Sequence, residues 1–157
     1  MRLLVAYGSK LGGTKGLAEM LGSELSDLGH TVEVRSGSEV SSVSEFDAVI
    51  VGGALYYFIS WHKDAKTLIR RHLKELRTKP VWVFSSGPLD DSALEKDIPP
   101  IRSVRKLITR VGARGHVTFG GRLENESRGL PVGDWRNAEH VRRWAEEINR
   151  ELTSVGS

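Results

Sequence analysis

The sequence predicts a single α/β domain: a three-layer, doubly wound structure whose five-stranded parallel sheet has the strand order 2-1-3-4-5. Three observations lead to this fold class. Short apolar runs typical of buried strands alternate with amphipathic helical segments along the chain. The 157 residues suit one domain, so residues 1–157 are expected to form one unit. No repeat or linker divides them.

The first strand and the first helix flank a glycine-rich turn. The apolar run from Leu3 to Ala6 ends at Gly8 and is typical of a strand buried on both faces. A helix is expected to follow and to stop at Gly29. Its apolar residues recur at a spacing near four, which places them on one face: Leu17, Leu21, Leu25 and Leu28.

The middle of the chain predicts two further strands and a second helix. A short strand is expected over Thr31 to Arg35, and the serine-rich stretch after it has room for only a brief helix or turn. The third strand, Ala48 to Val51, is expected to end at Gly52-Gly53. The helix after it has an apolar face made of Ala65, Leu68, Ile69, Leu73 and Leu76.

The last part of the chain repeats this alternation. A strand is expected over Val81 to Ser85 and another over Gly115 to Gly120. The helix between these two strands has its apolar face at Ile101, Val104, Ile108 and Val111. A final helix, capped by Asp134, is expected to turn Val141, Ala145, Ile148 and Leu152 inward.

Composition excludes several classes of function. The chain has no cysteine, which rules out disulfides, thiolate nucleophiles and cysteine-ligated metal centres. Four of the five histidines, at 62, 72, 116 and 140, have no ligand spacing with carboxylates, so no metal site is expected. No signal peptide or membrane-spanning segment is seen, and a cytoplasmic location is expected.

Basic residues gather in two segments although the formal net charge is only +3. The segments contain Lys63, Lys66, Arg70, Arg71, Lys74, Arg77 and Lys79, and then Arg102, Arg105, Lys106, Arg110 and Arg114. Solvated helix faces are the favoured interpretation, and docking on an acidic partner or an anionic membrane surface is the alternative. Nucleic acid is not expected, because no aromatic residues for base stacking lie among the charges.

The loop from Ser9 to Thr14 is the strongest candidate for a binding site. It joins the first strand to the first helix beside the point where the strand order reverses, where ligands bind in such sheets. Gly12 and Gly13 allow close approach of the backbone, and the N–H groups of the first helical turn attract an anion. The hydroxyls of Ser9 and Thr14 can donate, and Lys10 can neutralise charge.

Three common phosphate-handling loops do not fit this segment. A Walker A loop needs Gly-Lys-Ser/Thr, whereas the chain has Gly13-Thr14-Lys15. The dinucleotide fingerprint cannot be placed, and Arg35 stands where an acidic residue should end the second strand. A receiver domain would need Asp residues after the first and third strands, and the chain offers glycine and serine.

The same loop resembles the phosphate loop of flavodoxins, T/S-x-T-G-x-T. Its sequence is Ser9-Lys10-Leu11-Gly12-Gly13-Thr14, with Leu11 as the one departure. Later segments narrow the resemblance to bacterial flavodoxin-domain proteins related to menaquinone-dependent protoporphyrinogen oxidase. These segments are Gly52-Gly53-Ala54-Leu55-Tyr56-Tyr57, the stretch from Pro80 to Leu89, and Asp134-Trp135.

The resemblance implies a flavodoxin-like fold with FMN as the cofactor and its phosphate in the loop from Ser9 to Thr14. The ring would lie between two further loops, with Ala54, Leu55, Tyr56 and Tyr57 on one side. Backbone groups of Ser86, Gly87, Pro88 and Leu89 would meet its pyrimidine edge on the other. An alternative is that Tyr56, Tyr57, Phe58 and Trp61 only pack over a helix.

The expected function is that of an FMN-dependent oxidoreductase that passes electrons from an unknown organic donor to a quinone-type acceptor. No separate catalytic residue is expected, because the flavin carries the chemistry. A small flavodoxin-type electron carrier is the first alternative, although such carriers are usually acidic and this chain is basic. A flavin-free regulatory domain is the second. The protoporphyrinogen oxidase relatives carry a longer, basic and hydrophobic insertion late in the chain, whereas the segment from Arg122 to Gly133 is short and polar, so the resemblance does not extend to activity in the haem pathway. A redox partner protein and peripheral membrane contact remain open, as does the oligomeric state.

Overall fold

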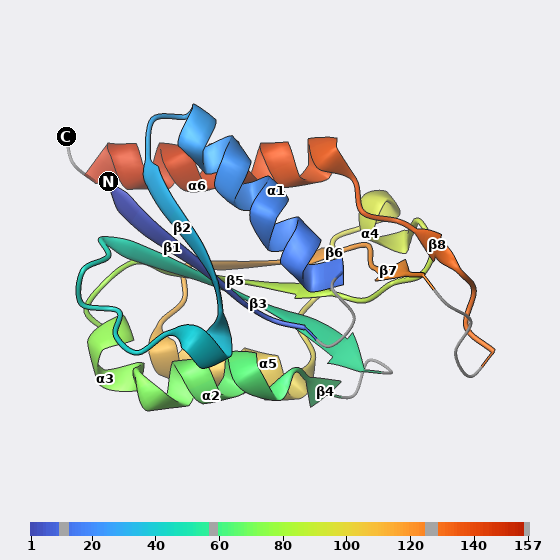
Figure 1. Cartoon of the computed structure of the whole chain (residues 1–157), viewed down its shortest axis with the longest axis horizontal. Helices are drawn as coiled ribbons and strands as arrows, with labels where there is room; N and C mark the ends of the chain where they lie inside the picture. Colours follow the sequence, from blue (N-terminus) through green and yellow to red (C-terminus); the bar gives the residue numbers. More distant parts are fainter. Residues whose placement is uncertain (10–12, 57–59, 125–128, 156–157) are drawn as a thin grey trace.

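The computed structural model describes residues 1–9, 13–56, 60–124 and 129–155. Its main sheet is parallel, in the order β2-β1-β3-β5-β6 (Figure 1). The bounds are Arg2–Gly8 for β1, Thr31–Ser36 for β2, Ala48–Tyr56 for β3, Val81–Ser86 for β5 and Gly115–Phe119 for β6. This is the predicted strand order, and it confirms the predicted three-layer fold.

Helices cover both faces of the sheet (Figure 1). One face carries α1 (Gly13–Asp27) and α6 (Ala138–Val155), which contact each other. The other face carries α2 (Lys63–Arg71), α3 (Leu73–Leu76) and α5 (Arg102–Val111). The short elements η1 (Gly37–Glu39) and α4 (Ser92–Glu95) lie in connections.

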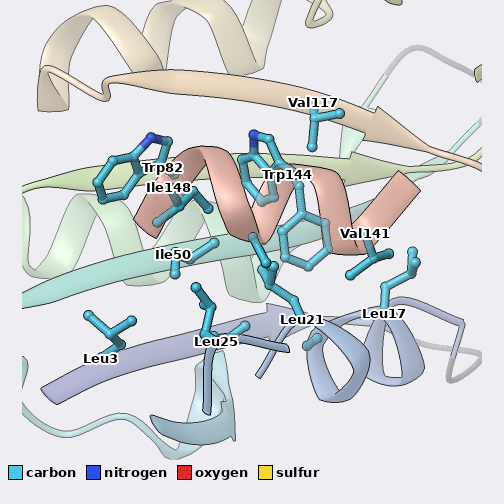
Figure 2. Packing of buried hydrophobic residues seen from close by; sticks show 14 of the residues in the cluster. Leu3, Leu17, Leu21, Leu25, Ile50, Trp82, Val117, Val141, Trp144 and Ile148 are labelled. Carbon is cyan, nitrogen blue, oxygen red and sulfur yellow. The ribbon is translucent and has the colours of Figure 1, made fainter. Parts of the chain in front are cut away.

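Two hydrophobic clusters lie on the two faces of the sheet. The first joins Leu3 and Ile50 to Leu21 of α1 and Trp144 of α6 (Figure 2). The second packs alternate residues of the same strands against the other helices, with Leu4, Val49, Val83, Leu68 and Val104 among its members. Because every central strand is buried on both sides, its sequence is a continuous apolar run.

The predicted end of the third strand at Gly52-Gly53 is wrong, because β3 continues to Tyr56. It then pairs antiparallel with β4 (Ser60–Trp61), with Leu55 opposite Trp61. Gly52 and Gly53 lie within this strand, where the rings of Phe84 and Trp61 occupy the space that a Cβ atom would need. The glycines therefore serve packing and not a turn.

The predicted cap of the last helix is also different. The helix begins at Ala138, and Asn137 Oδ1 accepts the N–H of His140 at 2.9 Å. Asp134 instead ends a two-stranded ribbon of β7 (Arg122–Leu123) and β8 (Gly133–Asp134). Its carboxylate is held by Arg136, so it is not available to the helix.

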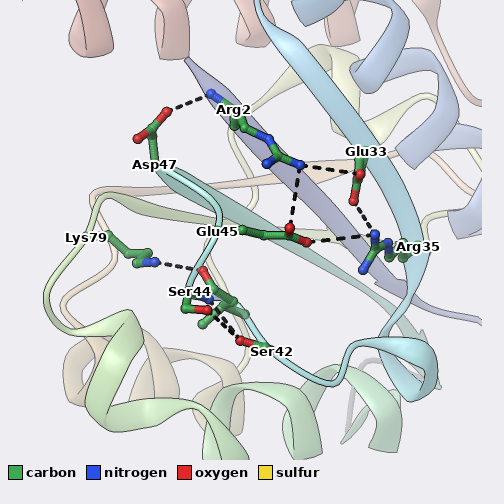
Figure 3. A network of polar contacts seen from close by, with 9 residues as sticks. Arg2, Glu33, Arg35, Ser42, Ser44, Glu45, Asp47 and Lys79 are labelled. Atoms are coloured by element: carbon green, nitrogen blue, oxygen red, sulfur yellow. Dashed lines mark hydrogen bonds and ion pairs between the residues drawn. The ribbon is translucent and has the colours of Figure 1, made fainter.

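Polar contacts join β1 and β2 to the segment before β3 (Figure 3). Arg2 lies between Glu33 and Glu45, and Arg35 pairs with Glu33 and approaches Glu45. The backbone N–H of Arg2 also donates to Asp47 at 2.7 Å. These contacts account for Arg35 at a position where a dinucleotide-binding chain has an acidic residue. No helix in the described part of the chain is both long and apolar enough to cross a membrane.

Candidate functional site

The candidate site lies where β1, β3 and β5 end. Gly8, the last residue of β1, is opposite Gly53 in β3, and Gly53 is opposite Ser85 in β5. The order of the strands along the chain reverses between β1 and β3, so the connections that leave these strands diverge there. The loop from Ser9 to Thr14 begins at this point. Its residues Lys10, Leu11 and Gly12 lie outside the described residues.

The first turn of α1 suits an anion. It contains no acidic residue, so no carboxylate competes for its N–H groups. Gly13, at its start, packs on the backbone of Arg122 in β7, where a Cβ atom would lie 3.5 Å from Arg122. Thr14, the next residue, is only 1% exposed.

Thr14 and Ser86 connect two of the predicted loops. Their hydroxyl oxygens are 2.6 Å apart, a hydrogen bond between the first turn of α1 and the end of β5. Both side chains are buried. The Ser86 side chain is therefore engaged with Thr14. The role expected for Ser86 toward a flavin ring involves its backbone and does not need this side chain.

Arg136 brings a guanidinium to the first turn of α1. It lies directly against Gly16, where a Cβ atom would collide with it. Asp134 fixes the guanidinium through contacts of 2.9 and 2.7 Å and also accepts the Arg136 backbone N–H at 3.0 Å. This pairing lowers the pKa of Asp134 and raises that of Arg136. The sequence motif did not reveal Arg136, because it lies more than a hundred residues from the loop.

The β3–β4 hairpin places Tyr56 and His62 beside each other at this edge. Their ring centroids are 5.9 Å apart. Burial is the main cause that raises the pKa of Tyr56, and Asp64 adds to it. Tyr57 and Phe58 lie outside the described residues. Trp61 is 1% exposed and packs in the core.

His62 lies at this edge of the sheet, and the sequence analysis did not assign it to the site. It precedes α2, where its Nδ1 accepts the N–H of Asp64 at 3.1 Å, and its ring packs against Gly8. Burial is the main cause that lowers its pKa. Its position directly after the second strand of a hairpin and before a helix is the signal that could have marked it.

The connection after β5 closes over the hairpin. A Cβ atom added at Gly87 would lie 3.0 Å from the Cβ of Leu55, so the two loops predicted to hold a ring are in contact. The N–H of Gly87 donates to Phe119, and the carbonyl of Pro88 accepts from Gly121 at 2.8 Å. Pro88 is buried, whereas Ala54 and Leu89 are half-buried.

Together, the fold and this edge define an α/β protein in which a helix N-terminus suited to an anion lies beside the ends of β1, β3 and β5. The model of the family described as flavodoxin domain matches residues 4–128. That match spans most of the chain, and the chain therefore belongs to the flavodoxin-domain family. No curated protein matches the sequence significantly.

Solved structures agree on the fold. A flavodoxin from the domain Archaea is 17% identical with a TM-score of 0.67, and the match covers 98% of this chain and 99% of that one. Flavodoxin 2 from Bacillus cereus is 19% identical with a TM-score of 0.67, with 96% and 99% covered. Rubredoxin oxygen:oxidoreductase from Desulfovibrio gigas is 16% identical with a TM-score of 0.71, but 98% of this chain covers only 36% of that enzyme.

Flavodoxin domains carry FMN, and FMN is accordingly the cofactor of this chain. The described residues fit the group. An acid-free helix start, with the guanidinium of Arg136 against it, suits the phosphate. Tyr56, Leu55 and Pro88 suit the faces of a flat ring. The relation to protoporphyrinogen oxidase is not part of what the family match shows.

Proposed function

We propose that the chain is an FMN-dependent oxidoreductase that passes electrons from an organic donor to a quinone-type acceptor. The observation that supports this acceptor most is the character of the edge between the two ring loops. Leu55 and Tyr56 are half-buried there, and Leu55 lies against Gly87, the residue before the buried Pro88; apolar surroundings of this kind suit a flat, uncharged acceptor. FMN supplies reversible one- and two-electron transfer when bound.

The residues of the site are assigned binding roles in this proposal. Ser9, Thr14 and the N–H groups of the loop would hold the phosphate, with Lys10 as a cation and Leu11 as a position without a donor. Gly12 and Gly13 would allow the close approach of the backbone. Ala54, Leu55, Tyr56 and Tyr57 would flank one side of the ring.

The other side of the ring would face the connection after β5. There the Gly87 N–H and the Pro88 carbonyl already have partners, so the Leu89 N–H and the Gly87 carbonyl are the groups we assign to the pyrimidine edge. His62 would support Tyr56 from behind. No side chain is assigned an acid–base step.

A flavodoxin-type electron carrier is the second candidate, and one observation favours it. The segment after Leu89 carries exposed Asp90, Asp91, Glu95 and Asp97 against the single cation Lys96. An acidic patch beside the cofactor edge would steer a basic redox partner, even though the chain as a whole is basic. Similarity to flavodoxins over almost the whole length of both chains agrees with this candidate.

Stopped-flow reoxidation of the reduced holoprotein separates the two candidates. We expect a soluble menaquinone analogue to reoxidise the flavin with saturation kinetics and at least about tenfold faster than it reoxidises free reduced FMN. Tyr56→Leu should slow that step, with FMN occupancy checked by fluorescence. Asp90→Asn combined with Asp91→Asn should leave it unchanged. The carrier would be favoured by two results together. The holoprotein would reduce a basic cytochrome quickly, at a rate that decreases in the Asp variant, and its reaction with the quinone would not saturate.

A further inference from the structure

Charge is divided unevenly between the two helical faces of the sheet. The helices α2, α3 and α5 carry nine Lys and Arg residues and only two acidic ones, Asp64 and Glu75. The helices α1 and α6 carry four basic and seven acidic residues. A formal net charge of +3 therefore hides a strongly basic face opposite a mildly acidic one.

We define the basic helix face by those nine residues. They are Lys63, Lys66, Arg70 and Arg71 in α2, Lys74 in α3, and Arg102, Arg105, Lys106 and Arg110 in α5. All are exposed except Lys66, which is half-buried. The face is continuous, because α5 contacts both α2 and α3.

The nine cations have no carboxylate within ion-pair distance among the described residues. Some other cations of the chain are engaged in structure. Arg2 and Arg35 are held by Glu33 and Glu45 (Figure 3). Lys79 donates to the carbonyls of Val43 and Phe46 at 2.7 and 2.9 Å. The nine cations of the basic helix face thus have no such partner in the described part of the chain and can meet an external anion.

One helix of this face forms a hollow of about 550 Å³. It is lined by Arg102, Arg105, Lys106, Thr109 and Arg110, which are four cations and one hydroxyl. Guanidinium groups bind phosphate oxygens in a bidentate manner, and a hydroxyl adds a donor. The side chains around the hollow therefore offer donors to a phosphate group at the surface.

From these observations we propose that the basic helix face docks on an anionic phospholipid surface. The absence of apolar anchors favours lipid over an acidic protein. The large exposed apolar side chains in the described ranges are Met1, Leu28, Leu94, Leu130 and Val132, and none belongs to α2, α3 or α5. Stable protein interfaces need a buried apolar or aromatic centre, whereas adsorption to headgroups needs only charge near the surface.

The test is sedimentation of the holoprotein with vesicles that contain roughly 30 to 40% phosphatidylglycerol in phosphatidylcholine, at low and high salt. We expect binding to these vesicles, loss of binding to pure phosphatidylcholine, and a steep decrease with salt. Arg105→Glu, Lys106→Glu and Arg110→Glu together should weaken binding by about a hundredfold.

A matched control uses the opposite face. Arg142→Glu, Arg143→Glu and Arg150→Glu together give the same net charge, and all three positions are exposed. We expect this variant to keep most of its vesicle binding. Equal loss in both variants, or no binding of the wild type to anionic vesicles, would overturn the proposal. The proposal would also be overturned if the chain bound an acidic protein through α5 but did not bind the anionic vesicles. Circular dichroism and bound flavin verify that each variant is folded.

Discussion

The hydroxyls of Thr14 and Ser86 are 2.6 Å apart and buried, which ties the start of α1 to the end of β5. These residues are 72 positions apart in the sequence and belong to two loops assigned to different ends of the cofactor. The bond therefore couples the loop to which we assign the phosphate with the loop to which we assign the ring.

Breaking this bond should destabilise the apoprotein. Thr14→Val leaves the Ser86 hydroxyl buried without its partner, and we expect a loss of about 1–3 kcal/mol in the free energy of unfolding. Ser86→Ala should cost a similar amount. In urea unfolding, the double variant should cost less than the sum of the two single variants. Additive losses would show that the two hydroxyls are not coupled.

Gly52→Ala should be strongly destabilising although glycine is a poor strand residue. A Cβ atom at this position would collide with the ring of Phe84 in the core. Overpacking of this kind costs about 1–3 kcal/mol or more. Thermal unfolding of Gly52→Ala combined with Phe84→Leu should show partial recovery. If Phe84→Leu gives no relief, Gly52 is needed for a reason other than the space above it.

The start of α6 offers a comparison of two candidate caps. Asn137→Ala should destabilise the protein by about 1 kcal/mol, because its side chain accepts the His140 N–H. Asp134→Ala removes the partner of Arg136 instead, and should alter the region of Gly16 without fraying α6. Amide hydrogen exchange at the first turn of α6 measures the difference. Faster exchange in Asp134→Ala alone would restore Asp134 as the cap.

His116 should make stability depend on pH. Burial lowers the pKa of its imidazole from 6.5 to about 4, and Asp97 opposes this effect only in part. Its Nε2 is 3.0 Å from the Ser85 hydroxyl. Between pH 6.5 and 4 the unfolded chain binds a proton that the folded chain excludes, so stability falls as the pH falls, by up to about 3 kcal/mol.

Replacing His116 by Asn removes this titration and keeps a polar partner for Ser85. The loss of stability between pH 7 and 4.5, measured by urea unfolding, should be smaller in His116→Asn than in the wild type. An equal loss in both proteins would assign the pH dependence to other groups.

The strand order could be predicted because buried strands such as Leu3–Ala6 and Ala48–Val51 are continuous apolar runs between amphipathic helices. The extension of β3 to Tyr56 could not, since its glycines are there for the rings of Phe84 and Trp61, which come from other strands. In the same way, Asp134 matched a capping pattern but has Arg136 as a nearer and stronger partner.

The candidate site likewise has a part that could be predicted from the sequence and a part that could not. Its location at Ser9 to Thr14 follows from a local motif and from the strand order. The contributions of His62 and Arg136 depend on contacts with Gly8 and Gly16, which are created only by the packing of distant segments. Such contacts leave no regular spacing in the sequence.

The central claim is that FMN is held through its phosphate by the loop after β1. The most direct measurement is titration of the apoprotein with FMN and with riboflavin, followed by flavin fluorescence, at fixed salt and pH. Because several charge-assisted hydrogen bonds to the phosphate are lost with riboflavin, FMN should bind at least about a hundredfold more tightly. Thr14→Val should weaken FMN more than riboflavin. Equal affinity for the two flavins in the wild type would contradict the assignment of the phosphate to this loop.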